Sequence, residues 1–149
     1  MTSRMLIVLM FALLILVGCN NETEVESVDV DRLEKEQVKK VIELRGIGLE
    51  EIDLSSPLEE DVSVTPYSFQ ISETEDNLFI YVFDSVEERK EDISDSLGHG
   101  VEVNGRKYHP FTAKNVALIY EADDDTDGDQ YILMTTKLDT IRRFMMDIG

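Results

Sequence analysis

A run of alternating aspartates holds the side chains of this chain best suited to bind a cation. Asp123, Asp125 and Asp127 match the start of an EF-hand calcium loop, D-x-D-x-D-G. Calcium prefers six to eight oxygen ligands, and alternate carboxylates can converge on one point. The twelfth position of such a loop needs a bidentate glutamate, but this chain has Met134 there. The pattern therefore predicts calcium binding only as an alternative function, with Asp129 as a further ligand.

The same acidic segment has a second interpretation. Residues 116–120 before it and residues 131–134 after it are apolar runs, and each suits a buried strand. The aspartates would then form the solvated tip of a hairpin, where acidic side chains oppose pairing between sheet edges.

Two histidines, His99 and His109, flank a predicted hairpin. Two imidazoles and a carboxylate can bind zinc, but no third ligand stands at motif spacing. We therefore expect exposed histidines in turns, and an enzyme that uses either of them is the least favoured hypothesis. No nucleophile elbow or phosphate loop is present in the sequence, so we expect a protein without catalytic residues or enzymatic activity.

The first 18 residues differ in kind from the remainder. Arg4 is their only charged residue, and it precedes the unbroken apolar run Met5–Val17. A membrane-spanning helix needs about 20 apolar residues, so this run is too short to span comfortably. A charged start followed by a short apolar run predicts a secretory leader.

The end of this leader carries a resemblance. Leu16, Val17, Gly18 and Cys19 resemble the lipobox of bacterial lipoproteins. The resemblance implies that the leader, residues 1–18, is cleaved before Cys19 and that a diacylglycerol is joined to its sulfur. Two acyl chains hold a protein stably on a membrane, whereas one chain binds only marginally. We therefore expect a lipid anchor on the extracytoplasmic face of the cell membrane.

Composition narrows the possible functions and the domain organisation of the residues that follow the leader. The 149 residues include 14 Lys and Arg against 32 Asp and Glu, a net charge of −18. This charge argues against nucleic-acid binding, because phosphate contacts need lysine and arginine. A single cysteine excludes a disulfide framework. Residues 19–30 predict an acidic, flexible tether, which leaves residues 31–149 for one domain.

Local patterns place helices and strands along this domain. Strand patterns run over residues 67–72, 78–83, 116–120 and 131–134, and Asn104-Gly105 is a strong hairpin signal between residues 101 and 108. Helices are predicted from Asp31 to Gly46, after Ser85, and from an N-cap at Thr136, while residues 47–66 read as irregular. The order predicts an α+β fold: a small mixed, mostly antiparallel sheet with about three helices packed on it.

Residues 78–89 and 114–120 are similar to segments of small, uncharacterised Gram-positive lipoproteins. That similarity supports the location and implies no chemistry. The sequence therefore predicts a lipid-anchored, non-enzymatic domain at the cell surface that contacts an unidentified protein partner.

Overall fold

The strands of this protein pair into one antiparallel sheet. The computed structural model describes residues 32–56, 58, 62–94, 100–103 and 105–148. Within these ranges the strand order is β1-β2-β3-β6-β5-β4, and every neighbouring pair is antiparallel. The elements are α2 (Lys35–Leu44), β1 (Leu49–Glu51), β2 (Tyr67–Ile71), β3 (Asn77–Val82), α3 (Val86–Asp92), β4 (Val101–Val103), β5 (Arg106–Ala113), β6 (Val116–Ala122) and α4 (Gly128–Asp147). The predicted α+β class is confirmed.

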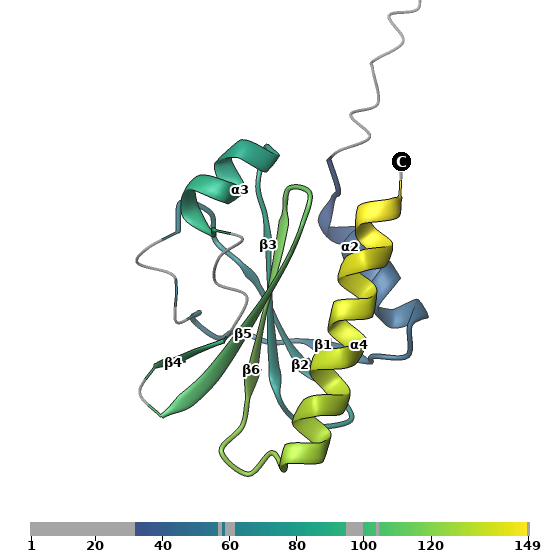
Figure 1. Ribbon diagram of the computed structural model, residues 1–149, viewed down its shortest axis with the longest axis vertical. Helices are drawn as coiled ribbons and strands as arrows, with labels where there is room; N and C mark the ends of the chain where they lie inside the picture. The colour runs from purple at the N-terminus through teal and green to yellow at the C-terminus, as the bar shows by residue number, and fades with distance from the viewer. Residues whose placement is uncertain (1–31, 57, 59–61, 95–99, 104, 149) are drawn as a thin grey trace, which may run out of the picture.

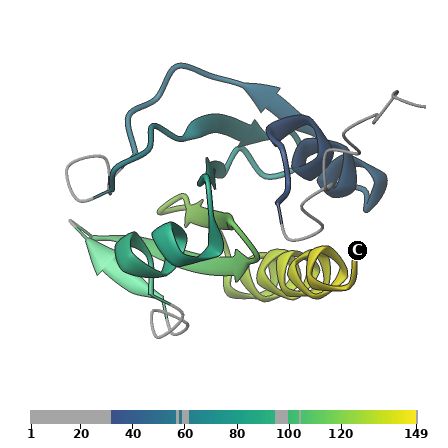
Figure 2. The same ribbon diagram turned by 90° about the horizontal axis from the view of Figure 1, so that it is seen from above.

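The two central strands are buried on both faces, as their apolar sequences predict. Alternation along β6 directs Leu118 and Tyr120 into the core beneath α2 and α4, and Ala117 and Ile119 into a second core. The second core also includes Ile93, which follows α3. Figure 1 shows α2 and α4 together on one side of the sheet and α3 on the other, and Figure 2 shows how the sheet twists between them.

Several local predictions are confirmed. Strands β2, β3 and β6 lie where the apolar patterns place them. Ser85 caps α3, because its side chain accepts a hydrogen bond of 3.1 Å from the backbone N–H of Glu88. The hairpin of β4 and β5 also forms, and Gly105 adopts the positive φ of 84° that its turn requires. Asn104 lies outside the described residues.

Helix α2 begins later than the sequence suggests. Its N-cap is Glu34, which forms a capping box with Gln37, whereas Asp31 lies outside the described residues. The preceding residue, Leu33, is held by a side chain from a distant turn. The side-chain carbonyl of Asn115 accepts the backbone N–H of Leu33 at 2.7 Å, and its amide group donates to the carbonyl of Leu33 at 3.0 Å.

The prediction of a strand at residues 131–134 and of a helix cap at Thr136 is wrong. These residues belong to α4, whose N-cap is Asp127. One carboxylate oxygen of Asp127 accepts the backbone N–H groups of Asp129 at 2.8 Å and Gln130 at 2.9 Å. The helical spacing of buried apolar residues starts at Met134 and continues to Met145, so the short apolar run joins the helix.

The segment predicted to be irregular, residues 47–66, contains the short strand β1. Its three residues pair with β2, and two of them are the exposed acids Glu50 and Glu51. A three-residue edge strand has too little apolar pattern to be recognised in sequence.

Candidate functional site

The acidic aspartates lie in the connection between β6 and α4 rather than at a hairpin tip. Asp123, Asp125, Asp127 and Asp129 are all exposed. Asp127 is committed to capping α4, and the carboxylate of Asp123 accepts the backbone N–H of Asp124 at 2.6 Å. Across the part of the chain that the structure describes, no three His, Cys, Asp or Glu side chains are grouped to hold a metal ion. Calcium binding stays a prediction without support from this geometry.

A buried carboxylate, Asp76, organises this connection. Asp76 is 1% exposed and lies between β2 and β3. Its carboxylate accepts the hydroxyl of Tyr120 at 2.7 Å, the backbone N–H of Asp123 at 2.9 Å and the hydroxyl of Thr126 at 2.5 Å. The pKa of the Tyr120 hydroxyl is raised, chiefly by burial and then by its hydrogen bond to the carboxylate. Asp76 is therefore a structural anchor for the acidic segment.

The sequence does not reveal the role of Asp76, because the residues around it are also polar. It stands in the polar run Glu73-Thr-Glu-Asp-Asn77, where an aspartate normally indicates a solvated turn. The groups that it holds are 44 to 50 residues away in sequence. No local pattern distinguishes this buried acid from its exposed neighbours.

Strand β6 carries a second buried acid, Glu121, which is 3% exposed. It forms an ion pair with Arg106 and accepts hydrogen bonds at 3.3 Å from the Tyr108 hydroxyl and the Asn77 amide. Burial and the adjacent carboxylate raise the pKa of Tyr108. These groups join three neighbouring strands and satisfy one another, so the cluster is structural.

The histidine prediction is wrong where the structure tests it. His109 lies within β5 and is partly buried, not exposed in a turn. Its ring centroid is 4.7 Å from that of Phe111, and its Nδ1 lies 3.2 Å from the Tyr131 hydroxyl. His99 lies outside the described residues.

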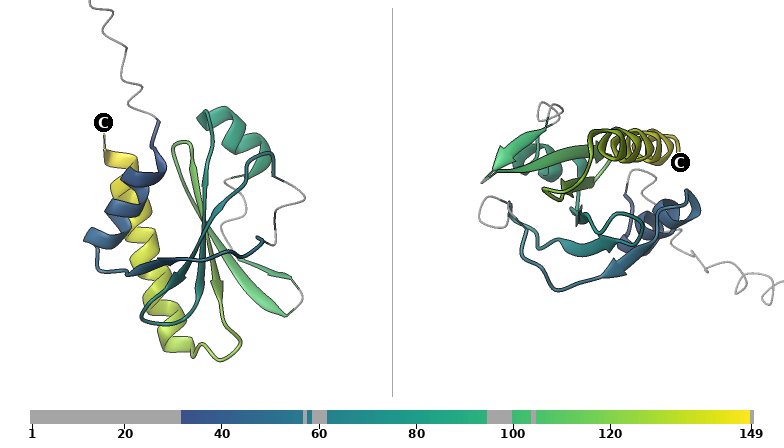
Figure 3. Two further views of the ribbon diagram at one scale, coloured as in Figure 1. Left: turned by 180° about the vertical axis from the view of Figure 1, so that it is seen from behind. Right: turned by 90° about the horizontal axis from the view of Figure 1, so that it is seen from below.

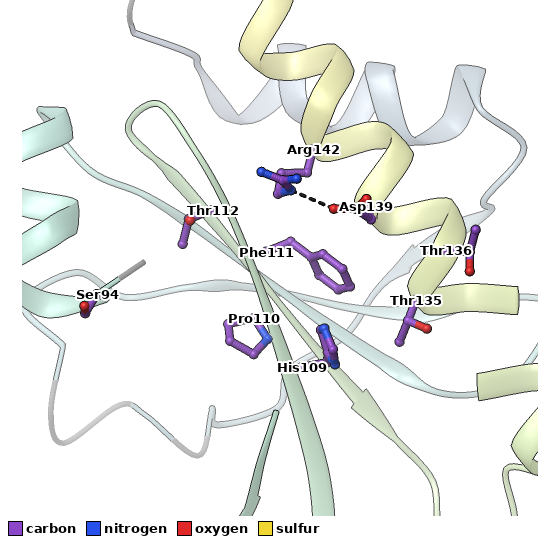
Figure 4. Close-up of a pocket in the computed structure, with 9 residues that line it drawn as sticks. All are labelled: Ser94, His109, Pro110, Phe111, Thr112, Thr135, Thr136, Asp139 and Arg142. Atoms are coloured by element: carbon purple, nitrogen blue, oxygen red, sulfur yellow. Dashed lines mark hydrogen bonds and ion pairs between the residues drawn. The ribbon is translucent and has the colours of Figure 1, made fainter. Parts of the chain in front are cut away.

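A groove of about 430 Å³ runs between β5 and α4 beside this histidine (Figure 4). It is lined by Ser94, His109, Pro110, Phe111, Thr112, Thr135, Thr136, Asp139 and Arg142. Its polar groups are already engaged: Arg142 Nε lies 2.8 Å from the Asp139 carboxylate, and the Thr135 hydroxyl donates to the carbonyl of Tyr131 at 2.9 Å. Figure 4 shows Ser94 apart from His109, with β5 between them, so they do not form a nucleophile–base pair.

The outer face of α4 is the feature that the core does not explain. Of the seven large apolar side chains exposed among the described residues, five belong to α4 or to the last residue of α2. These five are Leu44, Ile132, Leu133, Phe144 and Met146, with exposed fractions of 75%, 62%, 58%, 40% and 52%. Helix α4 also carries equal numbers of acids and bases, in a chain whose net charge is −18. This surface, which we call the α4 face, is suited to contact rather than to chemistry.

The start of the domain lies at a defined place relative to α4. The Lys114 ammonium donates to the carbonyl of Ile148, and the neighbouring Asn115 holds Leu33. Figures 1 and 3 accordingly show the chain entering α2 beside the C-terminal end of α4, while the acidic connection lies at the opposite end. Cys19 and the rest of the predicted leader and tether lie outside the described residues. Among the helices described, none is long and apolar enough to cross a membrane.

No protein family, curated protein or solved structure matches this chain.

Proposed function

We propose that this protein is a lipid-anchored domain on the extracytoplasmic face of the cell membrane and that it acts by contacting another protein. The anchor is Cys19, which follows the apolar run at the position of a lipobox. The contact surface is the α4 face. The protein has no enzymatic activity in this proposal, and its effect depends on what its surface binds.

The exposed apolar surface of α4 carries this proposal. Exposing apolar side chains such as Ile132 and Leu133 to water is unfavourable. The core does not require them, because α4 already fills it with other residues: Met134, Leu138, Ile141 and Met145. Large exposed apolar side chains that gather on one helix favour an interaction surface, because on an ordinary surface such residues are scattered singly. On a strongly acidic protein, a face without net charge also avoids the repulsion that other acidic surfaces would meet.

The tether limits where such a contact takes place. The tether predicted at residues 19–30 would reach about 20 Å on average, so in this proposal the domain stays near the bilayer. The net charge of −18 opposes close approach to an anionic lipid surface. A protein partner is therefore expected among the molecules of the cell surface.

Mass analysis of the full chain tests the anchor. The N-terminal peptide of the wild-type protein is expected to begin at Cys19 and to carry the added mass of acyl chains. Cys19→Ser removes that mass, and the neighbouring substitution Asn20→Ser retains it. An intact Met1 and no acyl mass on the wild-type protein would contradict the proposal.

Photocrosslinking in intact cells tests the contact. A photoreactive residue at position 132 is expected to give a product of one defined mass, and the same residue at exposed Lys90 on α3 serves as the control. Absence of a product specific to position 132, together with hydrolytic or transfer activity in a broad substrate screen, would contradict the proposal.

A further inference from the structure

We infer that the groove between β5 and α4 binds a small planar molecule that carries one carboxylate group. The groove has a volume of about 430 Å³, within the range of cavities that take small organic ligands. Figure 4 shows Arg142 toward one end of it, with the rings of Phe111 and His109 leading away. The inference goes beyond the proposed function, because it depends neither on the lipid anchor nor on the α4 face.

The charged end of the groove is a guanidinium group whose donors are only partly used. Nε of Arg142 donates to a carboxylate oxygen of Asp139 at 2.8 Å. Within the described ranges this is the only side-chain hydrogen bond of Arg142, so both terminal nitrogens keep their N–H donors for a ligand. Two such donors on one planar edge match the two oxygens of a carboxylate. The bond to Asp139 also restrains the guanidinium group before a ligand arrives.

The charges around Arg142 favour an anion over a cation. Both oxygens of Asp139 are engaged, one with Nε of Arg142 and the other at 2.8 Å from a terminal nitrogen of Arg143. Two guanidinium groups and one carboxylate leave a single positive charge in this group. A protein of net charge −18 repels a dianion more strongly than a monoanion. A carboxylate therefore suits the groove better than a phosphate.

The remainder of the groove offers a flat and largely apolar wall. The imidazole of His109 packs on Phe111, with ring centroids 4.7 Å apart and 30° between the ring planes. Tyr131 meets the same imidazole at 69°, and its hydroxyl lies 3.2 Å from Nδ1, so the imidazole is held from two sides. Pro110 continues the wall along β5. Rigid rings of this kind favour a planar ligand, which can pack against them over a large area.

The threonines on the α4 side limit where the anionic group can bind. The Thr135 hydroxyl donates to the carbonyl of Tyr131 at 2.9 Å, and the Thr136 hydroxyl donates to the carbonyl of Ile132 at 2.7 Å. Because both protons are committed to the helix backbone, neither hydroxyl donates to an anion. The carboxylate is therefore oriented by Arg142, and a ligand with one anionic group and an apolar body fits the groove.

Calorimetry of the full chain in detergent micelles, with empty micelles as the blank, tests the inference. The probe is indole-3-acetate, which joins a planar ring system to one carboxylate. We expect saturable binding with a Kd of about 1 mM or below, as the size of the probe allows. The neutral isostere indole-3-acetamide is expected to bind at least about tenfold more weakly, because it forms no charge-assisted pair with Arg142.

Three arginine substitutions separate the position of the guanidinium group from its charge. Arg142→Gln is expected to weaken the binding of indole-3-acetate by about tenfold or more. Arg143→Gln removes the same charge from the next residue, which is 73% exposed and does not line the groove. It is expected to change the affinity by less than about twofold, because salt screens an exposed charge. Arg142→Lys keeps the charge without the paired donors and is expected to recover only part of the affinity.

Amide chemical shifts of the same complex locate the probe. Changes centred on residues 109–112 and 135–142 are expected, with none at Glu50 of β1 on the far side of the sheet. Changes confined to Ile132 and Leu133 would place the probe on the α4 face and overturn the inference.

The other outcomes are equally decisive. Absence of saturable binding up to about 10 mM, equal affinity for the acid and the amide, or equal losses in Arg142→Gln and Arg143→Gln overturns the inference. Inorganic phosphate that displaces indole-3-acetate at equal concentration overturns the choice of a carboxylate. None of these results alters the proposed function, which is read from acyl mass and from crosslinking at position 132.

Discussion

Removing the carboxylate of Asp76 is expected to destabilise the connection between β6 and α4 more than any other single polar substitution in that connection or in the turn that holds it. Asp76→Ala takes an acceptor from the Tyr120 hydroxyl, the Asp123 amide and the Thr126 hydroxyl, at a position that is 1% exposed. Hydrogen bonds to charged groups contribute about 1.5–3 kcal/mol each, and their losses do not add fully. The free energy of unfolding should therefore fall by about 3–5 kcal/mol.

Urea denaturation followed by circular dichroism measures this loss, and two variants sharpen it. Asp76→Asn keeps one acceptor oxygen and should cost less, about 1–2 kcal/mol. Asp125→Ala removes an exposed carboxylate from the same connection and should change stability by less than about 0.5 kcal/mol. If Asp76→Ala proved no more destabilising than Asp125→Ala, the view of Asp76 as the anchor of this segment would be refuted.

Three further outcomes are expected. Asn115→Ala leaves the buried backbone groups of Leu33 and the carbonyl of Phe83 without partners and should cost about 2–4 kcal/mol, with faster hydrogen exchange at the Leu33 amide as the specific readout. The pKa of the Tyr120 hydroxyl is raised by burial and by its carboxylate partner, so the unfolded chain loses this proton at a lower pH than the folded one, and the free energy of unfolding should fall above about pH 10. Tyr120→Phe should make the free energy of unfolding less dependent on pH in this range. An unchanged pH dependence in Tyr120→Phe would contradict this assignment. Calcium at several millimolar should leave the melting temperature unchanged, whereas a rise at sub-millimolar calcium would restore the cation-binding alternative.

The elements that the sequence predicts correctly are those with a local cause. Ser85 caps α3 through a hydrogen bond to a residue three positions away. The apolar run of β3 is long enough to indicate a strand buried on both faces. Gly105 permits its turn wherever the surrounding chain lies. In each case the residues that cause the local structure lie within a few positions of it in the sequence, so the sequence pattern there is enough to predict it.

The errors have causes that lie elsewhere in the chain. The start of α2 depends on Asn115, which is 82 residues from Leu33 in sequence. His109 lies in a strand because β6 pairs with it, although the adjacent Pro110 suggests a loop. The connection before α4 depends on Asp76, which comes from another turn. Local propensity cannot report any of these contacts, because each is set when distant segments pack.

The error at residues 131–134 has a different origin, and it bears on function. The sequence predicts a buried strand here because all four residues are apolar, yet Ile132 and Leu133 are exposed on α4 while Met134 packs in the core. A helix that served only its own core would carry polar residues at the two exposed positions, and its periodicity would then be evident. Ile132 and Leu133 therefore mask the helical periodicity of the sequence, and they are also the residues of this run that do not pack in the core. Departures from local consistency of this kind are expected at functional surfaces, and here the two exposed residues belong to the α4 face.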